Sequence, residues 1–398
     1  MGGSISFSRT LRPFRALQMH GLILLFLSLM PSMARAEDGI HIKSMLIPYV
    51  TIETVQSDNI YFTPDLKQSG YSVTTAPGIK LELPLNRHML SLDYDTEMTR
   101  YVDFSSENTT DHHFKGQIDL KFGNLAGMQL QSTHMNDHEP RSSSHTGIIE
   151  KYESDAFTAS FSYQLADVSK VQLDYATTEW DFRSSSFRER NEILISGYIY
   201  YRVLPKTSAF MEYDRRNIDY DTFSNFTDNK SDSALLGLKW GINERSQGVI
   251  KGGYAWKDFD SASKEDYDTW TLSVDLSHRF TDYTALSLVN KRIVKEATIQ
   301  GADLILSSES HANFTHRFYT RIDAVLQGYY SKNNFLDVSS GDKEIREDRI
   351  IAVGAGVKYY FNDLMSLLLD YEHRERNSSD NSNDYDNNSY ILSLRFEL

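Results

Sequence analysis

Histidines, carboxylates and serines gather between residues 111 and 145, and hydrolytic chemistry uses these residue types. An imidazole can activate a serine or a water molecule when a carboxylate orients it. The candidates are His112, His113, His134, His138 and His145, with Asp111, Asp137 and Ser142 to Ser144 nearby. They follow no motif spacing, and a catalytic triad is defined by geometry rather than by closeness in sequence. We therefore expect no catalytic residues, and a hydrolase is the least favoured function.

Two further patterns could bind a metal ion, but neither has the spacing of a known site. His134 and His138 are four residues apart, and this spacing would place two ligands on one face of a helix. The pattern of this stretch, however, predicts a strand and a loop. The run 377–388 is rich in Asn and Asp but lacks the ligand order of an EF-hand. We expect no metal site and no cofactor.

Charged residues at alternate positions are more informative. Asp93, Asp95 and Glu97 alternate with Leu92 and Tyr94, and successive side chains of a strand point to opposite faces. One face of such a strand is therefore charged while the other is apolar. We predict ten residues that line an aqueous pore: Asp93, Asp95, Glu97, Asp174, Arg216, Asp275, Arg279, Arg321, Asp323 and Arg374. The alternative is that these charges pair across strands and only solvate the wall.

The elements that carry these residues alternate with the period of strands. Phe157–Leu165, Trp270–Leu276 and Tyr390–Leu398 each keep their apolar residues on one parity. A polar turn followed by alternating apolar residues returns eight times, at intervals of 36 to 45 residues. Each interval fits two long antiparallel strands, with a tight turn at one end and a longer loop at the other. Turn signals divide the sequence into eighteen strands, among them 302–315 and 319–334.

Connector lengths alternate along the chain. Leu83–Arg87 and Phe361–Met365 are short, whereas His138–Tyr152 and Phe335–Glu347 are long and polar. This alternation is typical of bacterial outer-membrane barrels, and the predicted strands are longer than those of a soluble sandwich or propeller. We predict an all-β fold, a transmembrane antiparallel up-and-down β-barrel of about eighteen strands (range 16–18), with short periplasmic turns and longer extracellular loops.

Tryptophans test the assignment of faces. Trp240, Trp256 and Trp270 fall on the outward parity, where aromatic girdles meet the membrane interface. Trp180 falls on the opposite parity. Either a bulge or a position in the lumen would explain it, and the sequence leaves both open.

The N-terminus has the pattern of a secretory signal peptide. Arg9, Arg12 and Arg15 precede the apolar stretch Gly21–Met30, and Ala34–Ala36 supplies a cleavage site. We expect residues 1–36 to be cleaved and residues 37–398 to form one barrel domain in the bacterial outer membrane, reached through the periplasm. The chain has no cysteine and a formal charge of −14, which argues against disulfides and against nucleic-acid binding.

Two segments carry a family resemblance. The end of the chain, Leu394-Arg395-Phe396-Glu397-Leu398 with Tyr390 upstream, is similar to the assembly signal of outer-membrane barrels, although those usually end in Phe. The segment Ser57-Asp58-Asn59-Ile60-Tyr61-Phe62-Thr63-Pro64, followed by Ser72-Val73-Thr74-Thr75-Ala76-Pro77-Gly78-Ile79, resembles the opening of a family of β-barrel porins, the second of that name. Members are often linked to exopolysaccharide or capsule gene clusters. The resemblance implies an outer-membrane pore that serves small solutes or surface polysaccharide, and the family supplies no catalytic residues.

We therefore expect a porin-like channel for passive passage of ions and small solutes, or of surface polysaccharide. The alternative is a non-conducting barrel that binds or assembles components of an exopolysaccharide export or surface-attachment system. The expected partners are outer-membrane lipids and lipopolysaccharide, the barrel-assembly machinery through the C-terminal strand, and polysaccharide or its export components.

Overall fold

The computed structural model describes residues 46–142, 148–221, 227–243 and 245–398. The expected signal peptide lies outside these residues, as do His145, Ser143 and Ser144. In the described ranges, no helix is long and apolar enough to cross a membrane.

Eighteen strands make up the described chain. They are β1 (Leu46–Ser57), β2 (Gly70–Leu85), β3 (His88–Tyr101), β4 (Thr109–Phe122), β5 (Ala126–Glu139), β6 (Glu150–Ala166), β7 (Ser169–Phe182), β8 (Arg190–Leu204), β9 (Thr207–Tyr220), β10 (Asn229–Asn243), β11 (Ser246–Phe259), β12 (Tyr267–Arg279), β13 (Thr284–Glu296), β14 (Leu304–Phe318), β15 (Ile322–Asp337), β16 (Lys343–Tyr360), β17 (Met365–Ser378) and β18 (Tyr385–Glu397). Single turns of 3₁₀ helix lie in four of the longer loops: η2 (Ser105–Glu107), η3 (Ser186–Arg188), η4 (Val338–Ser340) and η5 (Asn381–Asn383).

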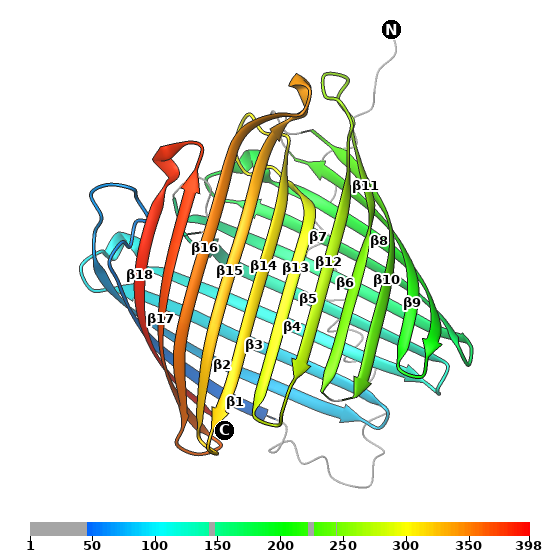
Figure 1. The fold of residues 1–398 in the computed structure, drawn as a ribbon, viewed down its shortest axis with the longest axis horizontal. Coiled ribbons are helices and arrows are strands. Elements are labelled where there is room, and N and C mark those ends of the chain that lie inside the picture. Colours follow the sequence, from blue (N-terminus) through cyan, green and yellow to red (C-terminus); the bar gives the residue numbers. More distant parts are fainter. Residues whose placement is uncertain (1–45, 143–147, 222–226, 244) are drawn as a thin grey trace.

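Each strand pairs antiparallel with the strands next to it in the sequence, and β1 pairs with β18, so the sheet closes into a barrel (Figure 1). The closing pair runs from Tyr49 opposite Glu397 to Ser57 opposite Ser389. Closure leaves no sheet edge, which a barrel in lipid requires because no water is present there to satisfy backbone groups. The predicted eighteen-stranded antiparallel barrel is confirmed.

The inner and outer faces follow from contacts that cross a strand. Tyr49 of β1 donates a hydrogen bond to Asp93 of β3 at 3.0 Å, although β2 lies between them, so both side chains project into the lumen. Gly78 of β2 lies under the ring, and a Cβ there would come within 2.3 Å of it. Large apolar side chains of the other parity are exposed on the outside, as at Leu173 and Leu369.

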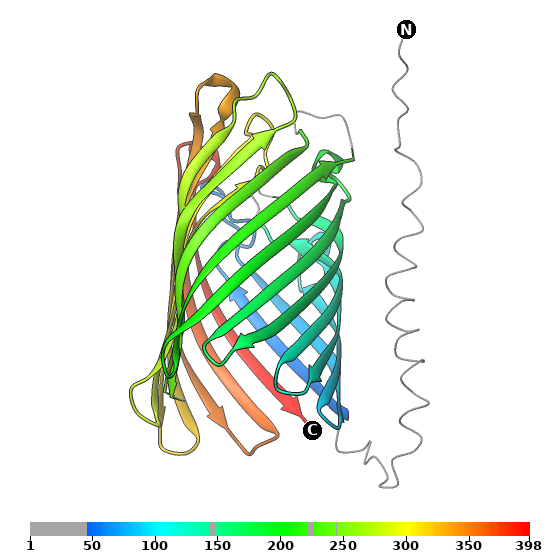
Figure 2. The same ribbon diagram turned by 90° about the vertical axis from the view of Figure 1, so that its right-hand side faces the viewer.

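The two rims differ in their connections. The short turns lie at the rim where β1 begins and β18 ends, and the opposite rim carries the longer loops (Figure 2). The short-turn rim is periplasmic in barrels of this type. Asn86 and Gly123 adopt left-handed conformations in two of the short turns, with φ of 60° and 62°, which is why residues tolerant of positive φ occupy them.

One turn differs from the prediction. β14 continues to Phe318, which pairs with Ile322, so the chain reverses at residues 319–321 instead of 316–319. Tyr319 has a φ of 59°, and Phe318 to Arg321 includes none of the usual turn residues Gly, Asn, Asp or Pro. Arg321 therefore lies in a turn at the periplasmic rim, not on the strand 319–334 that was expected to carry it.

Trp180 occupies a lumen position. The register of β7 is continuous through this residue, with Ser154 and Arg190 opposite it, so no bulge displaces it. Phe182 stacks on the indole, and the Arg190 guanidinium lies 5.4 Å from the ring centre. Trp270 and Trp256 are exposed on the outer wall, in agreement with the expected parity.

Candidate functional site: the lumen of the barrel

Carboxylates dominate the lumen wall on one side. We call the inward acidic residues of β17, β1, β3, β4 and β5 the acidic arc: Asp370, Glu53, Asp93, Asp95, Glu97, Asp111 and Asp137. Glu53, at the centre, lies within electrostatic range of Glu97 and Asp370 from the neighbouring walls. Cations share this wall: Lys80 pairs with Glu82 at 2.8 Å, Arg395 of β18 pairs with Glu397 at 2.8 Å, and Lys115 of β4 lies opposite Asp93 in the strand register. The arc therefore concentrates negative charge on one side of the lumen.

Two imidazoles sit inside the acidic arc. His113 Nδ1 lies 2.9 Å from Asp95 and its Nε2 lies 3.4 Å from Asp137, while His138 Nδ1 lies 3.1 Å from the buried Asp111. Among the described residues, two groups of possible ligand atoms within 4.8 Å of one another lie in the arc: Asp95, Glu97 and His113, and Asp111, Asp137 and His138. A third group, His134, Glu153 and Asp155, lies outside the arc. Such groups can hold a divalent cation or satisfy each other when the imidazole is protonated.

Among the described histidine candidates, His134 and His138 do not form a common site. His134 pairs with Asp155 at 2.9 Å, whereas His138 pairs with Asp111, so these two imidazoles have different partners. His112 contacts the hydroxyls of Tyr94 and Thr96. The imidazoles of His113, His134 and His138 thus pair with carboxylates, an arrangement that supplies no serine nucleophile.

Lys239 lies across the lumen from the acidic arc. β10, which carries Lys239, is nine strands from β1 in an eighteen-stranded barrel and so stands on the opposite side. Lys170 of β7 lies near Lys239, and its ammonium lies 4.4 Å from the centre of the Tyr200 ring. Both lysines line a recess of about 560 Å³ near the periplasmic rim, together with Asp275.

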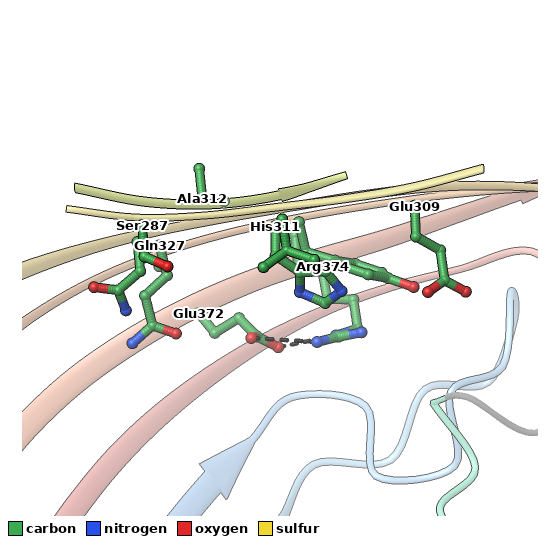
Figure 3. Close-up of a pocket in the computed structure, with 13 residues that line it drawn as sticks. Ser287, Glu309, His311, Ala312, Gln327, Glu372 and Arg374 are labelled. Atoms are coloured by element: carbon green, nitrogen blue, oxygen red, sulfur yellow. Dashed lines mark hydrogen bonds and ion pairs between the residues drawn. The ribbon is translucent and has the colours of Figure 1, made fainter. Parts of the chain in front are cut away.

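A second recess, of about 450 Å³, lies in the wall formed by β13 to β17 (Figure 3). Arg374 pairs with Glu372 at 2.9 Å, and His311 packs against Tyr329 with ring centres 4.6 Å apart. Figure 3 shows His311, Glu372 and Arg374 projecting to the same side of the sheet, while Ala312 projects to the other. Small residues of β16, such as Gly354, create the space in front of these polar groups.

Residues 39–398 match the family described as "Putative beta-barrel porin 2". The chain belongs to this family. No protein with a curated description matches the sequence. Among solved structures, the outer-membrane protein OpdK of Pseudomonas aeruginosa is similar at 8% identity, 89% coverage of this chain, 100% of that chain and a TM-score of 0.48. OccK5 (OpdH) of the same species is 10% identical over 89% of this chain and 99% of that chain, with a TM-score of 0.47. OccAB4 of Acinetobacter baumannii is 10% identical over 89% of this chain and 98% of that chain, with a TM-score of 0.46.

The sequence motif of this porin-family chain forms the loop between β1 and β2. The Asn59 side chain is fully buried; its amide donates to the carbonyls of Thr63 at 2.8 Å and Asp386 at 3.0 Å, and its oxygen accepts from Thr63 N–H. Asn387 of β18 donates to the Asn59 carbonyl at 3.0 Å. The motif therefore fastens the first loop to the last strand at the seam where the barrel closes.

Loops from the same side meet over the extracellular mouth. Arg141, after β5, pairs with Glu107 of η2 at 2.8 Å and lies over the ring of Tyr61 in the first loop. Tyr385 of β18 donates a hydrogen bond to the carbonyl of Ser142 at 2.7 Å. The loops after β1, β3 and β5 are therefore joined to each other and to β18.

Most of the ten predicted pore-lining residues lie on strands at the inward parity. Asp93 accepts from Tyr49, Asp95 pairs with His113, and Asp174 accepts from Gln172 at 3.0 Å. The remaining strand residues are Glu97, Arg216, Asp275, Arg279, Asp323 and Arg374. Arg279 is the last residue of β12, at the periplasmic rim. Arg321 lies in the turn described above.

Several of these charges are paired within the wall, as the alternative interpretation anticipated. Arg317 holds Asp323 in a two-pronged pair at 2.7 and 2.9 Å, and Tyr360 donates to the same carboxylate at 3.1 Å. Arg216 lies 3.8 Å from Glu192. Because these charges are paired with charges of opposite sign, the acidic arc remains the main concentration of charge of one sign on the inner wall.

Glu296 is a lumen residue that sequence parity does not identify. Alternation along β13 places it on the outward face with Leu286 and Leu288, yet it contacts Lys257, an inward residue of β11. In the sequence, Glu296 is the last residue of this parity before the long loop, and the polar residues Asn290 and Arg292 precede it on the same parity, so the pattern does not distinguish it.

Proposed function

We propose that this protein is a porin-like channel of the outer membrane that lets ions and small hydrophilic solutes diffuse through its lumen, with a preference for cations. The acidic arc is the observation that carries this proposal, because a ring sector of carboxylates raises the local concentration of cations and disfavours anions. An eighteen-stranded barrel is wide enough for an aqueous channel. The polar inner wall supports the same function.

Export of an acidic surface polysaccharide has less support. A polyanion would be repelled by the acidic arc, and it would also have to pass the loops that meet over the extracellular mouth. A neutral sugar would meet only the second of these barriers. We propose as well that residues 1–36 direct export through the periplasm, that β18 is the strand that the barrel-assembly machinery recognises, and that lipid and lipopolysaccharide surround the outer wall.

Planar-bilayer recording on the purified full-length protein tests the channel. We expect stepwise conductance increases, and in a salt gradient a reversal potential of the sign that indicates cation preference. Swelling of liposomes in isotonic sugar should show passage of small neutral solutes. A folded barrel, verified by its altered gel mobility without heating, that gives neither conductance steps nor swelling would exclude the channel and favour a binding or assembly role.

A further inference from the structure

The tip of the β13–β14 hairpin, residues 293–306, separates from β12 at the extracellular rim, while Leu304 and Leu306 stay paired with Leu336 and Asn334 of β15. β12 and β13 pair only between Leu272 opposite Arg292 and Arg279 opposite Ala285, although β12 begins at Tyr267. β13 continues to pair with β14 up to Glu296 opposite Leu304. In Figure 1 the β11–β12 and β15–β16 hairpins rise above the yellow β13–β14 hairpin between them. The hairpin is therefore intact while its tip leaves β12.

Burial shows that the tip lies inside the barrel. In a wall strand, adjacent side chains face opposite sides, yet the consecutive residues Leu304 and Ile305 are both buried, with exposed fractions of 0% and 2%. Leu304 belongs to an apolar cluster with Tyr267 of β12, against which Val294 of the tip and Phe259 of β11 pack. Because Phe259 and Tyr267 project inward from their strands, the outward face of the tip is covered by the inner face of the wall.

The other face of the tip meets residues from a distant part of the barrel. Ile305 clusters with Ala297, Ala302 and Phe335, and Phe187 of η3 and Tyr220 of β9 pack against this cluster. β9 is four strands from β13 and η3 joins β7 to β8. The tip therefore bridges part of the mouth instead of lining it.

Polar contacts fix the tip in this position. The Glu296 carboxylate accepts from Lys257 of β11, from the hydroxyl of Tyr220 at 2.8 Å and from the amide of Asn229 at 3.1 Å. The Lys257 side chain is 2% exposed, so its charge depends on this partner. Lys264, in the loop after β11, forms a second ion pair with Asp303 of the tip at 2.7 Å.

We propose that the hairpin tip is the constriction that sets the size limit for solutes at the extracellular mouth, and that the Glu296–Lys257 contact is the latch that holds it there. This inference rests on the proposed channel function. Loss of one latch partner leaves a charge without its counter-charge in a nearly dry site. Water is close by in the lumen, so the tip can relieve this cost by moving out of the mouth while the wall stays folded.

Single-channel recording and liposome swelling with sugars of increasing size test the latch. Glu296→Ala should raise the conductance severalfold or add long-lived states of higher conductance, and should admit larger sugars than the parent does. Deletion of residues 298–302 should have the same effect independently of the ion pair. The exchanged pair Lys257→Glu with Glu296→Lys should return the conductance toward that of the parent, because the opposite charges meet again.

The matched control is Glu212→Ala. Glu212 pairs with Lys251 at 2.6 Å, is 2% exposed and joins β9 to β11 within the wall, where no loop tip takes part. This variant should leave the size limit unchanged. If the parent conducts, and Glu296→Ala and the deletion both have its conductance and size limit, the latch is overturned. The channel function is unaffected by that result. A parent that forms a folded barrel but stays silent overturns the channel, and the latch with it.

Discussion

At the residue scale, the meaning of a side chain depends on which face of its strand carries it. Leu272 and Ser273 are adjacent on β12, yet Leu272 shares the outward parity of Trp270 and Ser273 lies opposite Lys251 on the inner wall. The same chemical change should therefore have very different effects at the two positions. This contrast tests the assignment of faces on which the acidic arc depends.

Leu272→Arg should lower the free energy of unfolding by about 1–2 kcal/mol, because a guanidinium on the lipid face loses hydration. The loss is smaller than at the midplane because Leu272 lies opposite Arg292 and two residues from the girdle residue Trp270. Urea unfolding in lipid vesicles, followed by tryptophan fluorescence, measures the change. Ser273→Arg, which places the charge in the aqueous lumen, is the control and should cost much less. Equal losses for the two variants would contradict the assignment of faces.

Substitution of Asn59 should lower the stability of the barrel. Asn59→Ala should cost about 1–3 kcal/mol, because the buried carbonyls of Thr63 and Asp386 lose their amide donor. Urea unfolding in lipid vesicles measures this loss, and protease cleavage within the first loop should become faster. Asn377→Ala is a suitable comparison because Asn377 is exposed and its amide donates only to the Glu375 side chain. Stability equal to the parent for Asn59→Ala would remove the proposed fastening of the seam.

At the element scale, the short turns are restricted by backbone conformation more than by packing. Gly123, between β4 and β5, has a φ of 62°, and a Cβ at this position would meet no atom within 4 Å. Substitution there adds conformational strain without a steric clash. A Cβ at Gly197 in β8 would likewise meet no atom within 4 Å, but Gly197 has no left-handed φ. The two glycines therefore separate strain from steric crowding.

Gly123→Val should destabilise the barrel by about 1–2 kcal/mol, because a branched side chain is disfavoured in the left-handed region. Gly197→Val should be neutral or stabilising, because valine suits an extended strand on the lipid-facing side. Denaturant midpoints of the two variants give the comparison. If Gly123→Val were as stable as Gly197→Val, the turn would have to accept a different conformation.

At the scale of the whole molecule, the proposed cation preference depends on the distribution of charge around the lumen. The acidic arc spans β17 to β5 across the seam, Lys239 lies on the opposite wall, and Lys170 of β7 lies near Lys239. The arc is built from strands at both ends of the chain, so its charge density exists only after β1 pairs with β18. The proposed cation preference therefore depends on closure of the barrel.

The double variant Asp95→Asn, Glu97→Gln should shift the reversal potential toward zero in a salt gradient, because it removes two carboxylates from the arc while keeping the side-chain shapes. The shift should be larger at low ionic strength, where screening is weaker. Asp155→Asn is the control, since Asp155 pairs with His134 on the outward parity. An unchanged reversal potential in the double variant would show that the arc does not govern selectivity.

Much of this architecture could be predicted from the sequence because it depends on local order. Alternation along Phe157–Leu165 and Tyr390–Leu398 identifies strands and their faces, and pairing between consecutive strands follows from short turns. The turn at Tyr319 was placed wrongly because Phe318 to Arg321 has no residue that commonly marks a turn. Most predicted pore-lining residues lie where alternation placed them, and their role in conduction stays a prediction.

The sequence by itself determined the strands, their faces and the up-and-down order, because these depend on side-chain parity and on turns between neighbours. The tertiary structure alone decided which residues meet across the lumen. Glu296 has outward parity, but β13 separates from β12 beyond Arg292 and carries Glu296 to Lys257. Parity gives a side chain's direction relative to its strand, whereas only the position of that strand in the closed barrel determines whether the direction leads to lipid, to water or to a buried ion pair.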